Sequence, residues 1–505
     1  MAAAIRRLIA LIIACLAFAA QAVDRGGQVL PAPGAADAMG SDVRPGSAWS
    51  ALDASLSAWL AANGLARAAV GLEIRDALTG EVLAGRNAGR PINPASLMKL
   101  LPVTASLQTL GPHFVWRTGW YLDGPLAGGR LAGDLLMVGD GDPKLVIEDL
   151  TELIAQMRAR GLQRIDGDLL IDDALFSLPP PGPPFDGQPN EPYNVAPSAG
   201  LLNFKSTKFV FTPRGSGVAL ELDPPLAGIA IRNRMRLEGG RCRHGPADAR
   251  FAQRGNDEVP EIVVSGRYSR ACGRRSAYFA VLDHRQFAEA FFRAAWEGAG
   301  GIWNGHAHYR SGALSRLPPE RRRQPWLVWQ SPRDLDSIAT DINKFSNNVM
   351  ARMLMLRLGV AIAGPQATES VAREAVLARL AQWGLDVSAV VMENGAGLSR
   401  RARLRPSLLG ELLVRALADP NTRGLRETLP VLGVDGTMRW RLTDRPVAGN
   451  AWIKTGSLED VRSIAGYLRA RSGRLYTVVL IVNDARARAA LGVQDRLLEW
   501  LYDAG

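Results

Sequence analysis

The chain has 505 residues, more than one ordinary hydrophobic core holds, so two or three domains are expected. Its hydrophobic content of 47% and charged content of 22% are ordinary globular values. The net charge of +11 would permit nucleic-acid binding, but the arginines are scattered along the chain and form no single stripe interleaved with aromatic residues. We therefore expect no nucleic-acid partner and a general preference for anionic surroundings.

Residues 1–22 have the composition of a secretory signal peptide. The segment "IRRL" is basic, an apolar run follows from Leu8 to Phe18, and the small-residue triplet "AQA" ends at Ala22. A membrane anchor is the alternative, but the apolar run is shorter than the roughly 20 residues that span a bilayer. We predict cleavage after Ala22, which leaves a secreted chain without a transmembrane anchor.

Three cysteines occur in the sequence, and Cys15 would be removed with the signal peptide. Cys242 and Cys272 would then meet an oxidising compartment, where a disulfide between them is the default prediction and two free buried thiols are the alternative. The segment "GHAHYR" places His306 and His308 close together, but no third ligand stands nearby. We predict neither a metal site nor a cofactor.

Residues 23–48 are rich in Gly, Ala and Pro and lack periodicity, which predicts a linker. In residues 49–113, "LDASLSAWLAANGL" has the apolar spacing of a helix, and "AAVGLEIRDALTGEVLAGRNAGRPINPAS" alternates like a strand pair. The next segment, "SLMKLLPVTASLQTLG", predicts a helix that ends at Gly111. Pro102 inside it should kink this helix or cost about 3 kcal/mol.

Residues 114–325 change to short alternating runs, such as "VWRTGWYL", "KFVFTP" and "EIVVSGRY", separated by Pro and Gly clusters. This pattern predicts one or two β-rich domains. Residues 326–505 return to helical patterns and finish with the strand-like runs "GNAWIKTG", "DVRSIAGYLRAR" and "RLYTVVLIVND" and a C-terminal helix. Strands at both ends of the chain indicate one sheet built from both ends, with the β-rich region inserted into its domain.

Only six lysines occur among the 60 Lys plus Arg residues, and Lys99 stands three residues after Ser96. On a helix, residues i and i+3 share a face, so the amine can reach the hydroxyl. Serine is a weak nucleophile until a base takes its proton, and lysine can be that base where burial and nearby positive charge lower its pKa. Arginine cannot, because its guanidinium stays protonated. Ser96 and Lys99 are a candidate nucleophile and base, although the SxxK spacing also occurs by chance.

Two further motifs follow. In "KFSNN", Ser346 and Asn348 begin a helical pattern and offer a hydroxyl that relays a proton and an amide that holds a peptide bond; the alternative is a simple helix cap. "KTGS", from Lys454 to Ser457, has a lysine and hydroxyls that suit a substrate carboxylate, and Gly456 lets the backbone approach closely. Three ordered motifs that hold three of the six lysines are a stronger signal than any one of them.

The order S-x-x-K, S-x-N and K-T-G is typical of class A β-lactamases and penicillin-binding proteins. Ser346 lies 250 positions after Ser96, far more than a single-domain β-lactamase needs. The long insertion resembles the low-molecular-mass class C penicillin-binding proteins, the D-alanyl-D-alanine carboxypeptidase/endopeptidase family of serine DD-peptidases. The stretches "GDGDPKL", "YNVAPSAG", "NGAGLSR" and "LPVLGVDGT" are also similar to that family, so the resemblance covers nearly the whole mature chain.

The resemblance implies an α+β fold. A serine β-lactamase/DD-peptidase-like catalytic domain, an antiparallel sheet flanked by helices, would comprise residues 49–113 and 326–505 and be interrupted by one or two β-rich domains at residues 114–325. The resemblance also implies a periplasmic enzyme without a cofactor. Its partners would be peptidoglycan stem peptides and β-lactams.

Roles for the first two motifs follow from the same resemblance. Ser96 would attack the carbonyl between two terminal D-alanines and form an acyl-enzyme, and Lys99 would take its proton. Ser346 would pass a proton toward the leaving amine, and Asn348 would bind the substrate amide. Water would then release the shortened peptide.

The third motif would hold the end of the substrate. Lys454 and Thr455 would bind the terminal carboxylate, with Gly456 giving close backbone approach. The backbone N–H groups of Ser96 and Ser457 would form the oxyanion hole.

Selectivity for the diamino acid of the substrate is associated in this family with an arginine, a residue after the KTGS motif, and an Asp with a Phe in the insertion. Here these positions are Arg400, Glu459, Asp172 and Phe176. Glu459 replaces a common glutamine, and its carboxylate would favour the amino end of that side chain or repel its carboxylate. Lys144 also stands where Thr or Ser is more usual.

Two other functions remain open at this point. A β-lactamase would use the same acylation chemistry and release the acyl group rapidly. A non-catalytic protein that binds peptidoglycan or β-lactams would share the fold without cleaving a peptide bond.

Overall fold

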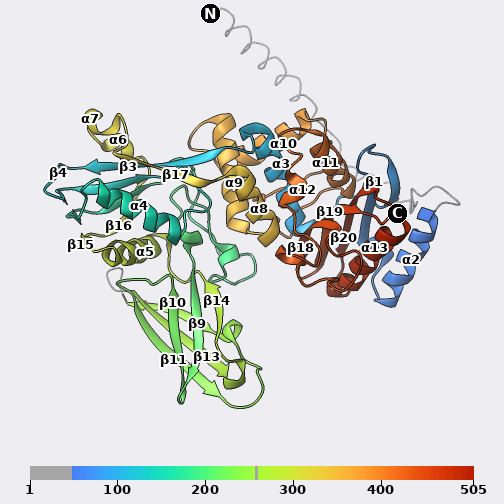
Figure 1. Ribbon diagram of the computed structural model, residues 1–505, viewed down its shortest axis with the longest axis horizontal. Helices are drawn as coiled ribbons and strands as arrows, with labels where there is room; N and C mark the ends of the chain where they lie inside the picture. Colours follow the sequence, from blue (N-terminus) through green and yellow to red (C-terminus); the bar gives the residue numbers. More distant parts are fainter. Residues whose placement is uncertain (1–47, 256–259) are drawn as a thin grey trace, which may run out of the picture. The chain divides into compact units, whose positions relative to one another are not determined.

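The computed structural model describes residues 48–255 and 260–505 (Figure 1). The predicted signal peptide and the predicted linker up to residue 47 lie outside the described residues. Within this described part of the chain, no helix is both long and apolar enough to cross a membrane.

One antiparallel sheet is built from both ends of the chain, as predicted. Its strand order is β18-β19-β20-β1-β2, so β1 (Val70–Asp76) from the N-terminal segment pairs with β20 (Leu475–Asn483) from the C-terminal segment. The strand that carries the KTGS motif, β18 (Ala451–Leu458), lies at the edge of the sheet. We call the domain around this sheet, residues 48–113 and 335–505, the main domain.

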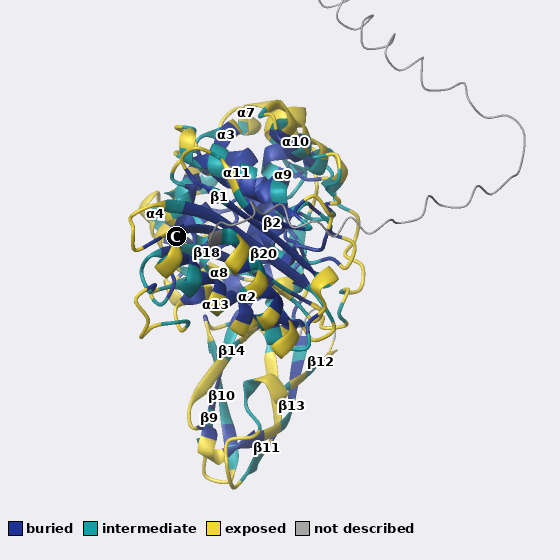
Figure 2. Ribbon diagram, turned by 90° about the vertical axis from the view of Figure 1, so that its right-hand side faces the viewer, coloured by how far each residue is buried: buried dark blue, intermediate teal, exposed yellow. Residues whose placement is uncertain are grey.

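Helices cover both faces of this sheet (Figures 1 and 2). Along β20, Val478 and Leu480 belong to the core formed with α2 (Ala48–Ala62) and α13 (Ala490–Ala504), whereas Val479 and Ile481 belong to the core formed with the other helices. Successive side chains of a strand point to opposite faces. Burial on both faces explains why this strand reads as a nearly continuous apolar run.

The remaining elements of the main domain follow the predicted order. They are β2 (Val82–Arg86), η2 (Ala95–Lys99), α3 (Leu100–Leu110), α8 (Leu335–Phe345), α9 (Asn348–Ala363), α10 (Glu369–Gln382), α11 (Pro406–Ala418), α12 (Leu425–Thr428) and β19 (Val461–Arg469).

The predicted helix around Pro102 differs in the structure. Residues 95–99 form the 3-10 helix η2, and the α-helix α3 begins only at Leu100 and ends before Gly111. Pro102 therefore lies in the first turn of α3, where backbone N–H groups have no partner within the α-helix. The predicted kink and its energetic cost are absent because the change of helix type takes place just before the proline.

The insertion leaves and re-enters the main domain through two paired strands. The outgoing strand β3 (Val115–Asp123) and the returning strand β17 (Leu327–Asp334) pair antiparallel (Figure 1). The sheet of the insertion thus extends to Asp334, beyond the predicted boundary at residue 325. The charged, Pro-flanked run before β17 has the composition of a loop, and it indicated a domain boundary there more strongly than the strand indicated a continued sheet. We call residues 114–334 the insertion.

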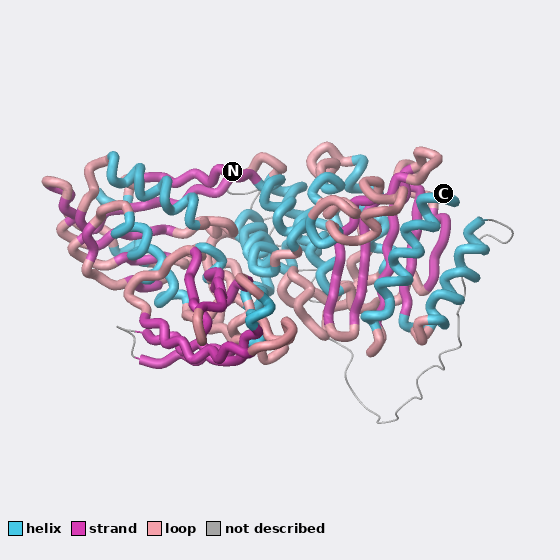
Figure 3. Tube along the Cα trace, turned by 60° about the horizontal axis from the view of Figure 1, so that its bottom comes forward, coloured by secondary structure: helices cyan, strands magenta, loops and turns pink. Residues whose placement is uncertain are grey.

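The insertion is rich in β-structure, as predicted (Figure 3). Its described residues form the sheets β16-β8-β6-β3-β17, β15-β7-β5-β4, β10-β9-β14 and β11-β13-β12. The strands are β4 (Leu126–Ala127), β5 (Arg130–Leu131), β6 (Asp134–Val138), β7 (Arg164–Ile165), β8 (Leu169–Asp172), β9 (Thr207–Arg214), β10 (Gly217–Asp223), β11 (Ala230–Glu238), β12 (Arg250–Gly255), β13 (Pro260–Ser269), β14 (Arg275–Phe279), β15 (Ile302–Trp303) and β16 (Ala307–Tyr309). The helices are α4 (Ile147–Ala159), α5 (His284–Gly298), α6 (Ala313–Arg316) and α7 (Pro319–Arg322).

A disulfide between Cys242 and Cys272 confirms the default prediction for these two residues. Their sequence separation is 30, and the bond joins the loop after β11 to the turn between β13 and β14. In the chain-entropy account, closing a loop of this length stabilises the folded state by roughly 3–4 kcal/mol.

One ion pair ties the insertion to α8, and a second one, within the insertion, lies beside it. Lys144 pairs with Asp341 of α8, which gives a structural role to a lysine at a position where Thr or Ser is more usual. Next to it, Arg333 at the end of β17 donates to Asp149 of α4 at 2.7 Å. Charged contacts therefore fix the segment that follows "GDGDPKL" against the entry to the second part of the main domain.

Candidate active site

Ser96 and Lys99 lie on one face of η2. A 3-10 helix has three residues per turn, so side chains at i and i+3 stand directly in line. Lys99 Nζ is 2.9 Å from Ser96 Oγ. The turn begins at Ala95, whose φ of 49° lies in the left-handed region that favours glycine. Such a conformation costs energy and is kept where the surrounding structure holds a functional residue in place.

Lys99 is completely buried, and three oxygens surround its amine. Besides Ser96 Oγ, these are Asn348 Oδ1 at 2.6 Å and the backbone oxygen of Ala396 at 2.7 Å. The last two oxygens only accept hydrogen bonds, so a neutral amine spends both of its hydrogens on them. Its lone pair then faces the serine hydroxyl, which is the arrangement a general base needs.

Burial holds the pKa of Lys99 well below its usual range, and the positive charge of Lys454 lowers that pKa further. The amine therefore gives up its proton far more readily than an exposed lysine. An arginine in this place would remain charged. The predicted pairing of nucleophile and base has both the geometry and the electrostatics that it requires.

A break between two helices presents the second motif. Ser346 ends α8 with a φ of 55°, and Asn347 caps α9 by accepting from Met350 N at 3.1 Å. The cap alternative is thus correct for Asn347, while the neighbouring residues point into the site. Ser346 Oγ lies 2.9 Å from Lys454 Nζ, and the Asn348 amide contacts Lys99.

The third motif lies on the edge strand β18. Lys454 is completely buried and donates to Ser346 Oγ at 2.9 Å and to the backbone oxygen of Thr455 at 2.7 Å. Burial lowers the pKa of Lys454 to about 7. Thr455 Oγ1 lies 2.9 Å from Thr437 Oγ1, and Ser457 is exposed. The two buried lysines therefore face two different serines, and Lys454 keeps one N–H for a ligand.

Gly456 lets β18 approach the nucleophile. A side-chain carbon at this position would lie 2.7 Å from the oxygen of Pro94 and 3.0 Å from the backbone nitrogen of Ser96, so only glycine fits. Ser463 of the next strand donates to Pro94 O at 2.7 Å and fixes the same contact. The backbone nitrogen of Ser96 therefore lies directly beside the strand that leads into Ser457, as an oxyanion hole made from these two N–H groups requires.

Two backbone oxygens contact Lys99 and Asn348, and neither contact was predicted from the sequence. Ala396 O accepts from Lys99, and Tyr193 O of the insertion accepts from Asn348 Nδ2 at 3.2 Å. Both belong to stretches noted for their family resemblance, "NGAGLSR" and "YNVAPSAG", and that resemblance was the available signal. Asn394 Oδ1 accepts from Ala396 N at 3.1 Å, an acceptor role that asparagine shares with the more usual aspartate.

The residues predicted to select the diamino acid do not all meet. Arg400 and Glu459 are exposed at 63% and 86% and stand 3.7 Å apart between Nη2 and Oε2. Asp172 is buried at the end of β8, where its carboxylate accepts from the backbone nitrogens of Gly312 and Leu314, both at 2.8 Å. The Asp172 carboxylate is thus engaged in holding α6.

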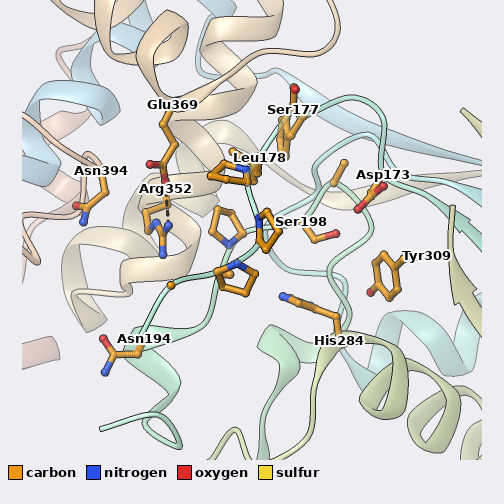
Figure 4. A pocket seen from close by; sticks show the side chains of 18 of the residues that line it. Asp173, Ser177, Leu178, Asn194, Ser198, His284, Tyr309, Arg352, Glu369 and Asn394 are labelled. Carbon is orange, nitrogen blue, oxygen red and sulfur yellow. Dashed lines mark hydrogen bonds and ion pairs between the residues drawn. The ribbon is translucent and has the colours of Figure 1, made fainter. Parts of the chain in front are cut away.

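The next residue, Asp173, lines a cavity of about 940 Å³ (Figure 4). Phe176 and Asn394 line the same cavity, whose wall includes the proline-rich segment 178–185. Ser311 Oγ donates to Asp173 Oδ1 at 2.6 Å, and no ion pair of Asp173 occurs among the described residues. Three other acids line the cavity: Glu369 pairs with Arg352, Glu393 pairs with Arg401, and Asp283 caps α5. Asp173 is therefore the lining carboxylate without an ion pair or a helix to cap among the described residues, and Phe176 lies in the same wall.

The histidines of "GHAHYR" contact separate carboxylates. His306 Nδ1 lies 3.1 Å from Glu289, and His308 Nε2 lies 3.2 Å from Asp168. In residues 48–255 and 260–505, no group of three or more His, Cys, Asp or Glu side chains is arranged to hold a metal ion.

Comparison with known proteins agrees with this geometry. The family model described as "D-Ala-D-Ala carboxypeptidase 3 (S13) family" matches residues 52–503. A D-alanyl-D-alanine carboxypeptidase of Actinomadura sp. (strain R39) is 28% identical over 444 residues, which cover 85% of this chain and 80% of the relative. A D-alanyl-D-alanine carboxypeptidase DacB of Haemophilus influenzae is 23% identical and covers 82% of this chain and 85% of its own length.

Solved structures show the same fold. The crystal structure of penicillin binding protein 4 (dacB) from Haemophilus influenzae matches with a TM-score of 0.70 and 22% identity, and covers 89% of this chain and 99% of that chain. A second structure of that protein, in complex with a β-lactam, matches with a TM-score of 0.67 and covers 86% of this chain and 96% of that chain. The predicted α+β fold with inserted β-rich regions is confirmed.

Proposed function

The chain belongs to the D-Ala-D-Ala carboxypeptidase 3 (S13) family, and from this premise we propose that it cleaves the D-Ala-D-Ala bond at the end of peptidoglycan stem peptides through an acyl-enzyme on Ser96. The observation that carries this proposal is the buried Lys99 amine, 2.9 Å from the Ser96 hydroxyl and with its other hydrogens engaged. We also propose that the enzyme works in the periplasm, since its start has the composition of a secretory signal peptide and this substrate lies there.

Acylation begins when Ser96 Oγ attacks the carbonyl carbon of the penultimate D-alanine. Lys99 accepts the hydroxyl proton, and a C–O bond forms as the carbonyl oxygen becomes an oxyanion. The backbone N–H groups of Ser96 and Ser457 donate to this oxyanion. Collapse of the intermediate then breaks the C–N bond.

The leaving D-alanine departs through the second serine. Its amine takes the proton of the Ser346 hydroxyl. The charged Lys454, whose Nζ lies 2.9 Å from Ser346 Oγ, then gives a proton back to that hydroxyl. Lys454 is half protonated near neutral pH, because burial lowers its pKa to about 7. Together with the Thr455 hydroxyl, the charged lysine binds the terminal carboxylate and orients the bond that breaks. Lys99 passes the proton it took from Ser96 to the now neutral Lys454 and can then deprotonate a water molecule. This water attacks the carbonyl carbon of the acyl-enzyme, the C–O bond to Ser96 breaks, and Lys99 returns its new proton to Ser96 Oγ.

The diamino acid side chain of the stem peptide extends toward the cavity that Phe176 and Asp173 line. The unpaired carboxylate of Asp173 suits a free amino group on that side chain. The exposed Arg400, whose Cζ lies 6.0 Å from the ring centroid of the lining residue Phe185, suits its carboxylate. We assign this amino contact to Asp173 and not to Asp172, the aspartate predicted to select the diamino acid, because the Asp172 carboxylate is engaged by backbone N–H groups.

Incubation of the purified protein with a pentapeptide that ends in D-Ala-D-Ala tests this function. We expect release of free D-alanine, stable labelling of Ser96 by a radioactive penicillin, and loss of both in Ser96→Ala. Rapid turnover of the penicillin would indicate a β-lactamase instead. Absence of D-alanine release, with Ser96→Ala equal to the unaltered chain, would indicate a non-catalytic binding protein. Cross-linked muropeptides in the same assay separate endopeptidase from carboxypeptidase action.

A further inference from the structure

One sheet of the insertion gathers arginines that are scattered in the sequence. In β11-β13-β12, residues that pair directly lie on the same face. The strand registers align Arg234 with Ser265 and then with Arg250, and align Arg236 with Arg267. Following them across the sheet places six arginines on one face, which we call the arginine face: Arg232, Arg234, Arg236, Arg250, Arg254 and Arg267.

The opposite face of this sheet is the buried one. Met235, Ile262 and Val264, at the alternate positions, belong to the core of the insertion. Asn233 Nδ2, also on that side, donates to Val218 O at 2.6 Å. All six arginines are exposed. The arginine face therefore points to solvent.

Most of the positive charge on the arginine face has no carboxylate partner. Arg232 pairs with Glu261 at 2.8 Å and Arg267 with Glu238 at 3.6 Å, and among the described residues the other four arginines form no ion pair. Residues 230–275 contain eleven arginines and five carboxylates, including the acids at 257 and 258. The segment thus keeps a net positive charge even if every acid in it were paired.

We propose that the arginine face binds the carboxylates of peptidoglycan stem peptides and holds the enzyme on the cell wall. The proposal rests on the proposed function, because the wall is then the polymer on which the main domain acts. Guanidinium groups bind carboxylates through two parallel hydrogen bonds. Neighbouring strands lie about 4.8 Å apart, and alternate residues of one strand lie about 7 Å apart. The three strands therefore present the guanidinium groups in regular rows, which suits a polymer with repeated carboxylates.

The chemistry of the arginine face favours a polar polymer over a lipid surface. Membrane-binding surfaces combine basic residues with exposed apolar side chains that enter the bilayer. Here the other residues on this face are Ala230, Ala252, Ser265, Ser269, a buried Val263, and the two acids Glu238 and Glu261 that pair with Arg267 and Arg232. The exposed Ile231 belongs to the opposite face by its position in the strand. No large apolar side chain of these three strands stands beside the guanidinium groups.

Sedimentation with purified, insoluble peptidoglycan tests the proposal. The triple variant R234Q/R236Q/R250Q removes three unpaired arginines, and R67Q/R423Q/R496Q removes three exposed arginines of the main domain for the same change in net charge. Because single exposed ion pairs contribute little, we expect about tenfold weaker binding for the first variant and less than twofold change for the second. Binding of the unaltered chain should also weaken between 50 and 500 mM salt.

A single substitution at the centre of the face gives a second, milder test. Ser265 stands between Arg234 and Arg250, so Ser265→Glu should reduce binding severalfold, whereas Ser265→Gln, of equal size, should not. Equal binding of all variants would overturn the proposal, and so would binding to phosphatidylglycerol vesicles but not to peptidoglycan. D-Alanine release from a soluble pentapeptide should stay unchanged in every variant, which separates failure of this proposal from failure of the proposed function.

Discussion

The main domain and the insertion place their cations in opposite surroundings. Lys99 and Lys454 are completely buried, and burial lowers both pKa values. The arginine face is exposed, and its guanidinium groups remain charged at any physiological pH. Burial thus makes each of the two lysines a group that can exchange protons, whereas the exposed arginines act as fixed positive charges. Each region uses the residue type that suits its role.

The largest effect of exchanging lysine and arginine is expected at Lys99. Lys99→Arg replaces the neutral amine by a fixed positive charge and removes the base, so acylation by a labelled penicillin should fall roughly a thousandfold or more. The rate of labelling in a stopped time course measures this. Substantial remaining activity would show that another group deprotonates Ser96. The matched exchange in the insertion, R234K/R236K/R250K, should leave penicillin acylation unchanged and should weaken peptidoglycan binding less than R234Q/R236Q/R250Q does, because the charge is kept while the paired hydrogen bonds are lost.

The two regions should also differ in their response to loss of the disulfide. Cys242→Ser with Cys272→Ser removes the bond, and the insertion should lose roughly 3–4 kcal/mol of stability. Amide hydrogen exchange measures this locally: the β13 amides should exchange faster, while those of β20 keep their protection. D-Alanine release from a short soluble peptide should change less than twofold. Equal destabilisation of β20 would mean that the two regions unfold together.

The pH dependence of the KM should report the protonation of Lys454, the second of the two buried lysines. Lys454, with a pKa of about 7, is mostly charged at pH 6 and mostly neutral at pH 8, so its grip on a carboxylate weakens as pH rises. The KM for a D-Ala-D-Ala peptide should rise about tenfold across this window. A neutral activated ester without a carboxylate is the control, since its KM should stay constant. A KM that fell with rising pH would contradict the assignment of Lys454.

The smallest effect is expected at the junction of the two regions. Lys144→Gln removes the ion pair with Asp341, in which both partners are partly exposed. The expected loss is about 1 kcal/mol or less, which corresponds to about 1–2 °C in the thermal midpoint. Differential scanning calorimetry measures it, with Lys144→Arg as the charge-retaining control. A larger shift would show that the junction stabilises the main domain.

Much of the fold is predictable from local patterns. Alternating runs predicted β9 and β13, apolar spacing predicted α10 and α11, and strand-like runs at both ends predicted the shared sheet. The prediction was wrong where neighbouring structure changes the backbone. Pro102 is accommodated because a 3-10 helix precedes α3. The place of β17 in a sheet of the insertion depends on its pairing with β3, which a local pattern does not show.

In the active site, too, local motifs predicted some residues, whereas other contacts depend on the tertiary structure. The order of the three motifs in the sequence indicates Ser96, Lys99, Ser346, Asn348 and Lys454. Which of two adjacent aspartates faces the cavity was not predictable, because successive residues at a strand end point in opposite directions. Backbone acceptors such as Ala396 O and Tyr193 O have no signature in the sequence, since every residue carries a carbonyl group.

The sequence by itself determined the chemistry of this protein: a serine with a lysine one short turn away, and two further lysine motifs in a fixed order. Only the tertiary structure decided how that chemistry is tuned and where the remaining charge acts. Burial lowers the pKa of Lys99, and burial is a property of everything packed around a residue. Likewise, arginines more than thirty residues apart in the chain form one face only because strand pairing aligns Arg236 with Arg267.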